Sequence, residues 1–217
     1  MAIKHFNHII FDLDGTLTDP GVGITRSIQY ALAKYGKTEK TAALYKCIGP
    51  PLRDSFCNYF GFTMEQAEEA VSYYREYFSE HGIFENEVYP GIPELLEELK
   101  ADNRIIYLAT TKPVIYAEKI LRHFNLFDYF TAVSGSNLDG TNGAKSELIA
   151  GIIRNYRINQ PVTAVMIGDR KYDIEGAKAN GISSIGVGYG YGEPGELADA
   201  FPDYIAETVP ALNKILL

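Results

Sequence analysis

The segment Phe11–Asp19, which reads FDLDGTLTD, crowds three aspartates around a Gly-Thr pair directly behind an apolar run. Carboxylates this close repel one another, so the group is typical of a place where a cation or a reaction requires it. The ordinary alternative is a turn that ends a strand, because Asp and Gly favour such turns. A turn accounts for one aspartate, and Asp19 suits a helix N-cap as well as a supporting role. Asp12 and Asp14 are therefore the first candidates for chemistry.

Further polar residues follow apolar runs later in the chain. Thr110, with Thr111 beside it, and Asp169 each come at the end of such a run, Asp173 lies one turn further, and Lys145 opens a predicted helix. Ligands of an open parallel sheet bind beyond the carboxyl ends of its strands. Taken singly, the hydroxyl and the lysine suit ordinary surface roles, and the two acids suit a helix start. The ordered set favours one shared site.

Each of these residue types has a role if the ligand is a phosphate monoester, since phosphoryl transfer needs a nucleophile, a cation and donors for the oxygens. Asp12 can attack phosphorus and form an aspartyl-phosphate. Asp14 points the same way along an extended chain, so it can protonate the leaving oxygen and later activate water. Thr110, Thr111 and Lys145 can hold the phosphoryl oxygens.

The aspartates also predict a metal. Magnesium prefers hard oxygen ligands and is usually held by one or two carboxylates together with substrate phosphate. Asp12 and Asp169 suit that description, and Asp14 and Asp173 complete the acidic set of expected ligands. Direct binding by Asp173 and a supporting role both stay open. We therefore expect Mg²⁺ as the cofactor and a small phosphorylated metabolite as the partner.

The elements that position these residues follow from hydrophobic patterning. Phe6–Phe11 is a short apolar run that predicts a buried parallel strand. No comparable strand follows until about Val88, and the intervening chain predicts an all-helical unit. Its four expected helices are Gly23–Gly36, Thr38–Ile48, Pro50–Gly61 and Thr63–Gly82.

After Pro90, predicted helices and strands alternate, which specifies a parallel sheet covered by helices on both faces. The expected strands are Arg104–Thr110, Tyr129–Gly135, Thr163–Asp169 and Ser183–Gly190. The expected helices are Gly91–Asn103, Lys112–Asn125, Gly143–Tyr156, Lys171–Gly181, Pro194–Ala200 and Val209–Leu217. The fold class is therefore α/β, with residues 1–18 and 88–217 forming the sheet domain and residues 19–87 an inserted helical cap.

Composition excludes several classes of function. The chain has 217 residues, 46% of them hydrophobic, and a formal net charge of −8, so it can bury a core but offers no basic surface for a nucleic acid polymer. It contains no apolar run of membrane-spanning length and no signal-peptide pattern, so we expect a cytoplasmic protein with no membrane partner. Cys47 and Cys57 show no metal or disulfide spacing. Monomer and homodimer both remain open.

The ordered motifs resemble those of haloacid dehalogenase superfamily phosphatases, namely DxDGT, a Ser or Thr after a hydrophobic strand, a Lys, and GDxxxD. Here they read DLDGTLTD, LATTKP, NGAKSE and GDRKYD. The resemblance covers essentially the whole chain, because the helical insertion matches the family's cap. It implies a Rossmann-like core. The stretches IGPPL and GDRKYDIEGAKANGI look most like phosphoglycolate phosphatases and bacterial 5′-nucleotidases.

This resemblance implies a phosphatase, with phosphoglycolate or a nucleoside 5′-monophosphate as the leading expected substrates. A sugar-phosphate mutase on the same fold and an inactive regulatory binder stay as alternatives. A dehalogenase is disfavoured, since that branch lacks the second acid and Asp14 is present. Arg53, behind a Gly-Pro-Pro turn at a helix start, is a candidate for holding an anionic substrate. An ordinary helix start with a solvated Arg53 is an equal alternative.

Overall fold

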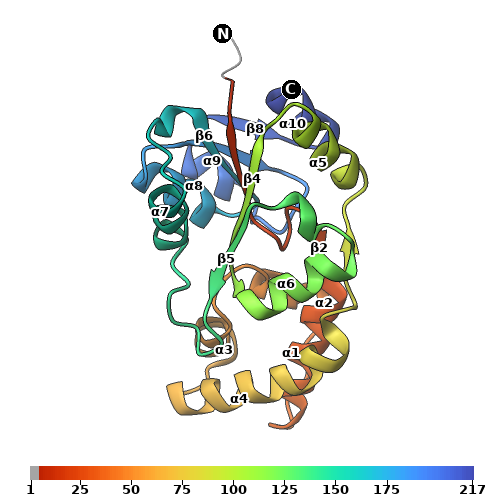
Figure 1. The fold of residues 1–217 in the computed structure, drawn as a ribbon. Coiled ribbons are helices and arrows are strands. Elements are labelled where there is room, and N and C mark those ends of the chain that lie inside the picture. The colour runs from red at the N-terminus through yellow and green to blue at the C-terminus, as the bar shows by residue number, and fades with distance from the viewer. Residues whose placement is uncertain (1–4) are drawn as a thin grey trace. The chain divides into compact units, whose positions relative to one another are not determined.

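The chain divides into two compact units in the computed structural model, which describes residues 5–217 (Figure 1). The core unit comprises Met1–Thr18 and Val88–Leu217, and the helical unit comprises Asp19–Glu87. The chain passes between the units at two places, Thr18 to Asp19 and Glu87 to Val88. The two passages pair as a two-stranded sheet of β2 (Thr18–Asp19) and β3 (Glu87–Val88). Sequence patterning missed both strands, because two residues are too few to show a period.

The core unit is built on a sheet of six parallel strands within the described residues. Their spatial order is β5 (Ala132–Ser136), β4 (Ile105–Pro113), β1 (His8–Phe11), β6 (Ala164–Gly168), β7 (Ser183–Val187) and β8 (Tyr204–Ala206). The predicted parallel α/β sheet is thus confirmed, with β1 near its middle. β8 was not predicted, since this three-residue edge strand buries only Ala206 fully.

Strand register explains where the polar motif residues lie. Phe11, the last residue of β1, is level with Leu108 on β4 and with Ile167 on β6. Asp12 therefore leaves the sheet between the ends of the two neighbouring strands, and its N–H donates to the Ile167 carbonyl at 2.9 Å. Thr110 lies two residues beyond Leu108 on β4. The central strands thus bring Asp12 and Asp169, which are far apart in sequence, to the carboxyl edge of the sheet.

Helices cover both faces of the sheet. On one face, α7 (Lys145–Asn155) contacts β4 and β5, α8 (Lys171–Ala179) contacts β6 and β7, and α9 (Glu196–Ala200) packs against α8 (Figure 1). On the other face, α5 (Ile92–Ala101) and α6 (Val114–His123) contact β4, and α10 (Val209–Leu216) packs against α5 and β8. Short 3₁₀ turns precede β5 and β6 at Phe127–Tyr129 and Pro161–Thr163.

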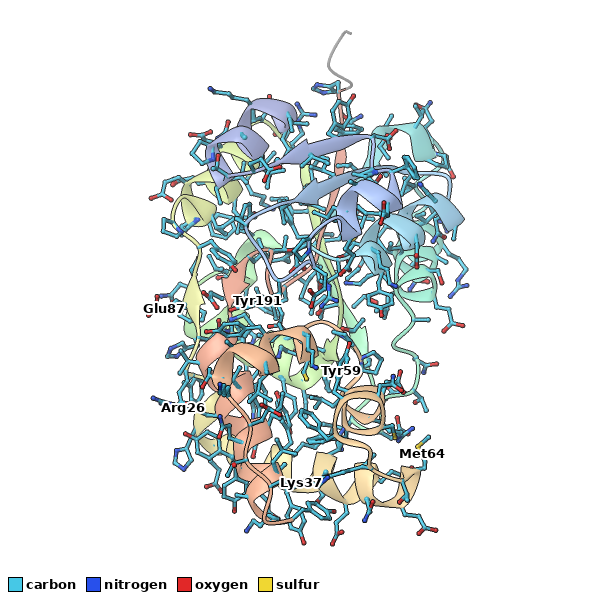
Figure 2. All side chains as sticks on the ribbon, turned by 180° about the vertical axis from the view of Figure 1, so that it is seen from behind. Arg26, Lys37, Tyr59, Met64, Glu87 and Tyr191 are labelled. Atoms are coloured by element: carbon cyan, nitrogen blue, oxygen red, sulfur yellow. The ribbon has the colours of Figure 1, made fainter. Side chains whose placement is uncertain are left out.

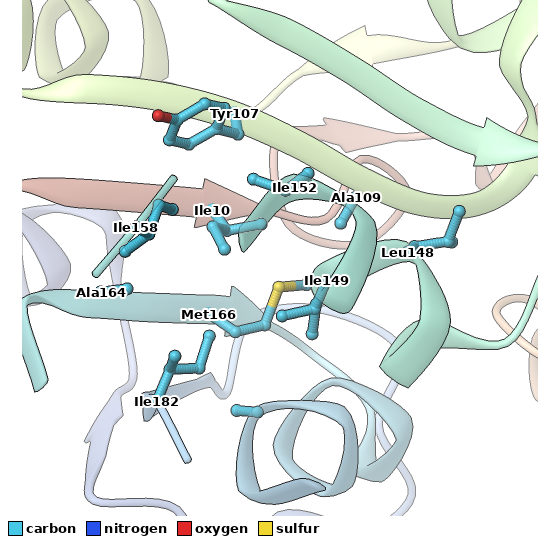
Figure 3. Packing of buried hydrophobic residues seen from close by; sticks show 11 residues of the cluster. Ile10, Tyr107, Ala109, Leu148, Ile149, Ile152, Ile158, Ala164, Met166 and Ile182 are labelled. Carbon is cyan, nitrogen blue, oxygen red and sulfur yellow. The ribbon is translucent and has the colours of Figure 1, made fainter. Parts of the chain in front are cut away.

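The apolar face of α7 anchors it to the sheet. Leu148, Ile149 and Ile152 pack in one cluster with Ile10 of β1 and Met166 of β6, and all are buried (Figure 3). Burial of each such side chain stabilises the fold by about 1.5–3 kcal/mol. The cluster therefore fixes α7, and with it the lysine that begins this helix, against the two strands that carry the first and last acidic motifs.

The helical unit contains α1 (Gly21–Ala33), α2 (Thr41–Leu44), α3 (Leu52–Phe60) and α4 (Met64–Tyr77), followed by a π-helical turn at Phe78–Gly82. α4 begins with a capping box in which Thr63 and Gln66 bond each other's backbone N–H groups. Asp19 accepts the N–H of Gly21 at 3.0 Å, at the start of α1. None of the helices among residues 5–217 is long and apolar enough to span a membrane.

The single helix expected over Thr38–Ile48 was wrong. The segment forms only the four-residue α2 and a 3₁₀ turn at Tyr45–Cys47. Lys40 is extended, with no side-chain cap for α2, and Ile48 is extended again. Gly49 follows with φ of 102° and precedes two prolines, which cannot continue a helix.

Candidate active site

Three buried aspartates meet at the carboxyl edge of the core sheet. Asp12 follows β1, Asp169 follows β6, and Asp173 lies in the first turn of α8; each offers a carboxylate oxygen, and these oxygens lie within 4.8 Å of one another. Such crowding is costly without a cation, because like charges in a buried site repel. The chemistry of the donor set, hard oxygens from carboxylates, fits Mg²⁺.

Lys145 partly offsets this negative charge. Its Nζ lies 2.9 Å from Asp12 Oδ1 and 2.8 Å from Asp173 Oδ1, and it donates to the Ala109 carbonyl at 2.9 Å. Burial lowers the pKa of Lys145, but Asp12 and Asp173 outweigh that effect, so the pKa is raised above its ordinary value. The ammonium therefore remains charged and holds one oxygen of Asp12 in place.

Asp169 is the least satisfied of the three carboxylates. Its Oδ2 accepts the backbone N–H of Tyr191 at 2.7 Å, whereas its buried Oδ1 has no hydrogen-bond partner among residues 5–217. Burial, followed by the charges of Asp173 and Asp12, raises the pKa of Asp169 well above its usual range, and the Tyr191 N–H only partly opposes this. A buried oxygen left without a partner costs free energy, so Asp169 is a good candidate ligand for a cation.

Asp173 accepts a backbone hydrogen bond in addition to its ion pair with Lys145. Its Oδ2 accepts the N–H of Arg170 at 3.2 Å, which closes the start of α8. Burial raises the pKa of Asp173, and the Lys145 ammonium opposes that rise. The predicted helix-start role is thus real, and the same side chain also lies within the acidic group.

Asp14 stands apart from the three clustered aspartates. Its Oδ2 forms an ion pair of 2.9 Å with Lys112 Nζ, and its side chain is 14% exposed while that of Lys112 is 6% exposed. Burial raises the pKa of Asp14 although Lys112 opposes it. Asp14 lies two residues from Asp12, and its raised pKa suits a general acid. The ion pair with Lys112 gives no support to the expected direct binding of metal by the Asp14 carboxylate.

The remaining predicted site residues divide between the two units. Thr110 is buried at the end of β4, where its Oγ1 accepts the Lys112 N–H at 3.3 Å, and Thr111 follows it, partly buried, in an irregular stretch of the strand. Arg53 belongs to the helical unit, where it is exposed and pairs with Glu68 at 3.5 Å. An exposed pair of this kind contributes little to stability.

Several residues of the site were not predicted. Lys112 is one position beyond the threonines in LATTKP, and its partner Asp14 is far away in sequence. Tyr191 contributes a backbone N–H, which no side-chain pattern could reveal. Gly190, in the glycine-rich stretch GVGYGYG, packs directly on Asp169, since a Cβ there would lie 2.4 Å from the Asp169 Cβ. The repeated glycines were the available signal.

These motifs, in this order on this fold, agree with a family match. The sequence profile of the haloacid dehalogenase-like hydrolases matches residues 9–187, so the chain belongs to that family. The predicted family resemblance is thereby confirmed. Several proteins with similar sequences and structures are named as phosphatases, and the chain is an enzyme of this phosphatase class.

Three relatives illustrate the range of the similarity. A 5′-nucleotidase from Pseudomonas aeruginosa is 45% identical over 99% of this chain and 97% of its own. A tyrosine-protein kinase from Mycobacterium tuberculosis is 38% identical over 85% of this chain and 62% of its own. The crystal structure of a predicted phosphatase from Clostridium acetobutylicum is 44% identical, covers 97% of both chains and superposes with a TM-score of 0.92.

Proposed function

We propose that the protein is a magnesium-dependent phosphomonoester hydrolase that works through an aspartyl-phosphate on Asp12. The observation that carries this proposal is the group of Asp12, Asp169 and Asp173, in which Lys145 pairs with Asp12 and Asp173. Asp14 lies two residues along the chain from Asp12. The site holds a nucleophile, a fixed positive charge and an acid, which are the parts that phosphoryl transfer needs.

In the first step, Asp12 attacks phosphorus. Its Oδ1 is occupied by the Lys145 ammonium and by the Leu13 N–H at 2.8 Å, so Oδ2 is the attacking oxygen. A bond forms between Oδ2 and phosphorus while the ester P–O bond breaks. The leaving oxygen takes a proton from Asp14, so the alcohol departs neutral. Thr110 is proposed to donate its hydroxyl to a phosphoryl oxygen, and Lys145 to contribute its positive charge beside the phosphoryl group.

In the second step, water displaces Asp12 from phosphorus. Asp14, now ionised, takes a proton from water, the resulting oxygen bonds to phosphorus, and the bond to Asp12 breaks. Inorganic phosphate leaves, and Asp12 returns as a carboxylate. One ester and one water thus yield one alcohol and one phosphate.

Magnesium fits the acidic group for two reasons visible in the residues. Asp169 presents a buried carboxylate oxygen that has no hydrogen-bond partner in the described part of the chain, and the single ammonium of Lys145 does not neutralise three aspartates. Asp12, Asp169 and, directly or through a water, Asp173 would hold the ion. When bound, it would neutralise charge on the transferring phosphoryl group.

The substrate proposed here is a small phosphorylated metabolite. A nucleoside 5′-monophosphate leads, because the 45%-identical relative is named a 5′-nucleotidase, and phosphoglycolate is second. Arg53 and Thr111 are proposed as further substrate contacts, and the Asp19–Glu87 unit as the cap that selects substrate. We place the protein in the cytoplasm as a monomer or homodimer.

A panel assay tests this function. Phosphoglycolate, nucleoside 5′-monophosphates and hexose phosphates are each incubated with Mg²⁺ or chelator, and inorganic phosphate is measured. We expect magnesium-dependent release that falls by at least about a thousandfold in Asp12→Asn, since the nucleophile is lost. Asp128→Asn is the matched control, because it makes the same change at an exposed aspartate in the 3₁₀ turn before β5. Equal activity of Asp12→Asn and Asp128→Asn contradicts the proposal.

The same assay separates the alternatives. A mutase returns the phosphoryl group to a sugar, so a hexose phosphate is isomerised without stoichiometric phosphate release. A tyrosine-protein kinase, as the M. tuberculosis relative is named, would release no phosphate from the esters of the panel. An inactive regulatory binder would hydrolyse none of the esters in the panel. Water as the main acceptor favours the hydrolase.

A further inference from the structure

The loop Gly188–Gly192, which follows β7, contacts the acidic site through its backbone. Figure 2 shows Tyr191 on this loop, and its N–H donates to Asp169 Oδ2 at 2.7 Å. At Gly190, a Cβ would lie 2.4 Å from the Gly15 carbonyl oxygen and 2.5 Å from Asp169 Oδ2. The loop therefore lies directly against both the turn that carries Asp14 and the carboxylate of Asp169.

The side chain of Tyr189, in the same loop, contacts the turn after Asp14. Its hydroxyl donates to the Thr16 carbonyl at 3.0 Å. That turn is closed by its own backbone bonds, among them Gly15 N–H to the Thr18 carbonyl at 2.8 Å. Thr18 is the last core-unit residue before the first passage to the helical unit.

The ring of Tyr189 also contacts the second passage. It packs edge-on against Tyr89, with ring centroids 5.0 Å apart and planes at 66°. Tyr89 directly follows Val88, where the chain re-enters the core unit, and its N–H donates to the Leu17 carbonyl at 3.1 Å. The Tyr189 side chain thus contacts core-unit residues next to both passages. The backbone N–H of Tyr191, in the same loop, bonds Asp169.

We propose that Tyr189 is a positioning residue that fixes the turn bearing Asp14 relative to Asp169 and ties both passages to this arrangement. Its hydroxyl acts through the Thr16 carbonyl and its ring through Tyr89, without touching the reacting atoms. The kinetic part of this role rests on the proposed phosphatase function. The structural part, restraint of the two passages, does not depend on it.

The role predicts separable effects for two substitutions. Tyr189→Phe keeps the ring and removes the hydroxyl, so the Thr16 carbonyl loses its donor while the contact with Tyr89 remains. Tyr189→Leu removes both. The matched control is Tyr107→Phe, which removes a core-unit tyrosine hydroxyl that bonds His8 Nδ1 at 3.2 Å, at the opposite ends of the strands.

Hydrogen exchange followed by mass spectrometry, together with steady-state kinetics on the full chain, tests the proposal. In Tyr189→Phe we expect faster exchange in peptides spanning residues 14–18, and kcat lowered by about five- to tenfold with KM changed less than about twofold, the factor that one lost hydrogen bond gives if it is fully expressed in the transition state. In Tyr189→Leu we expect faster exchange also at residues 88–90. Tyr107→Phe should show neither effect.

Three results overturn the proposal. Exchange and kcat of Tyr189→Phe equal to those of the intact protein remove the role entirely. Faster exchange with unchanged kcat reduces Tyr189 to a contributor to stability. Lower kcat with unchanged exchange means that it acts by another route. If the intact protein hydrolyses no ester, the phosphatase function fails, and unchanged exchange in both variants still refutes the restraint.

Discussion

Replacement of Asp169 by asparagine separates the stability of the fold from the chemistry of the site. The amide preserves the shape of the side chain, and its oxygen can still accept the Tyr191 N–H at the Oδ2 position. Its nitrogen replaces the buried Oδ1 that has no hydrogen-bond partner, and it can donate toward Asp12 or Asp173. The change therefore removes one charge from a buried group of like charges.

The expected rise in melting temperature follows from the free-energy cost of burying Asp169 Oδ1. A buried unsatisfied polar group costs about 1–3 kcal/mol, and in a protein of this size about 1 kcal/mol shifts the melting temperature by 2–4 °C. In chelator, Asp169→Asn should therefore melt about 2–12 °C above the unmodified protein. Magnesium should reverse the order, because a ligand at one hundred times its Kd stabilises the protein that binds it by about 2.7 kcal/mol.

The difference in stability should also depend on pH. The pKa of Asp169 is higher in the folded chain than its ordinary value of 3.8, so the folded chain binds this proton more tightly than the unfolded chain does. The unmodified protein in chelator therefore loses stability as pH rises from about 4 through the raised pKa. Asp169→Asn lacks that loss, so its advantage should grow over this window.

Thermal unfolding monitored by circular dichroism, in chelator and in a magnesium titration, measures these effects. Asp128→Asn serves as the control for loss of one negative charge on the surface. The reasoning is refuted if Asp169→Asn melts below the unmodified protein in chelator, or if magnesium stabilises both proteins equally.

Three further predictions follow from the same contacts. Asp14→Asn should retain formation of the intermediate with activated esters yet lose at least about a hundredfold in turnover of ordinary esters, as rapid-quench kinetics would show; normal turnover would remove the acid role. Gly168→Ala should lower both stability and magnesium affinity in melting and binding titrations, since a Cβ there would lie 2.0 Å from the Asp173 Cγ; unchanged affinity would argue against Asp173 as part of the metal site. Calcium should fail to replace magnesium in the phosphate-release assay, because its larger and looser coordination aligns nucleophile and phosphate poorly; equal rates with the two metals would contradict this reasoning.

Much of the core unit could be predicted because its signals are local. Apolar runs such as Phe6–Phe11 and the helix that begins at Lys145 show their type within a few residues, and parallel order follows from their alternation. The short strands β2, β3 and β8 carry too few residues for a pattern. The short helical stretch of α2 and the following 3₁₀ turn is bounded by extended backbone at Lys40 and Ile48, which neither residue type dictates.

The site shows the same division. Asp12, Lys145, Asp169 and Asp173 were predicted as one group because each follows a strand or opens a helix in an ordered motif, and the structure brings them together. The ion pair between Asp14 and Lys112 joins residues nearly one hundred positions apart, on the order of half the chain, and depends on the irregular end of β4. Contacts of this kind come from tertiary packing and leave no local signature.

The most direct test of the account is whether phosphate becomes covalently attached to Asp12 during turnover. The Asp14→Asn variant, mixed with magnesium and an activated phosphate ester, is quenched in acid, digested and examined by mass spectrometry, with Asp12→Asn as the negative control. We expect a peptide containing residue 12 that is heavier by one phosphoryl group and loses it on treatment with hydroxylamine. Phosphorylation at another residue, or steady ester hydrolysis by Asp12→Asn, would contradict it.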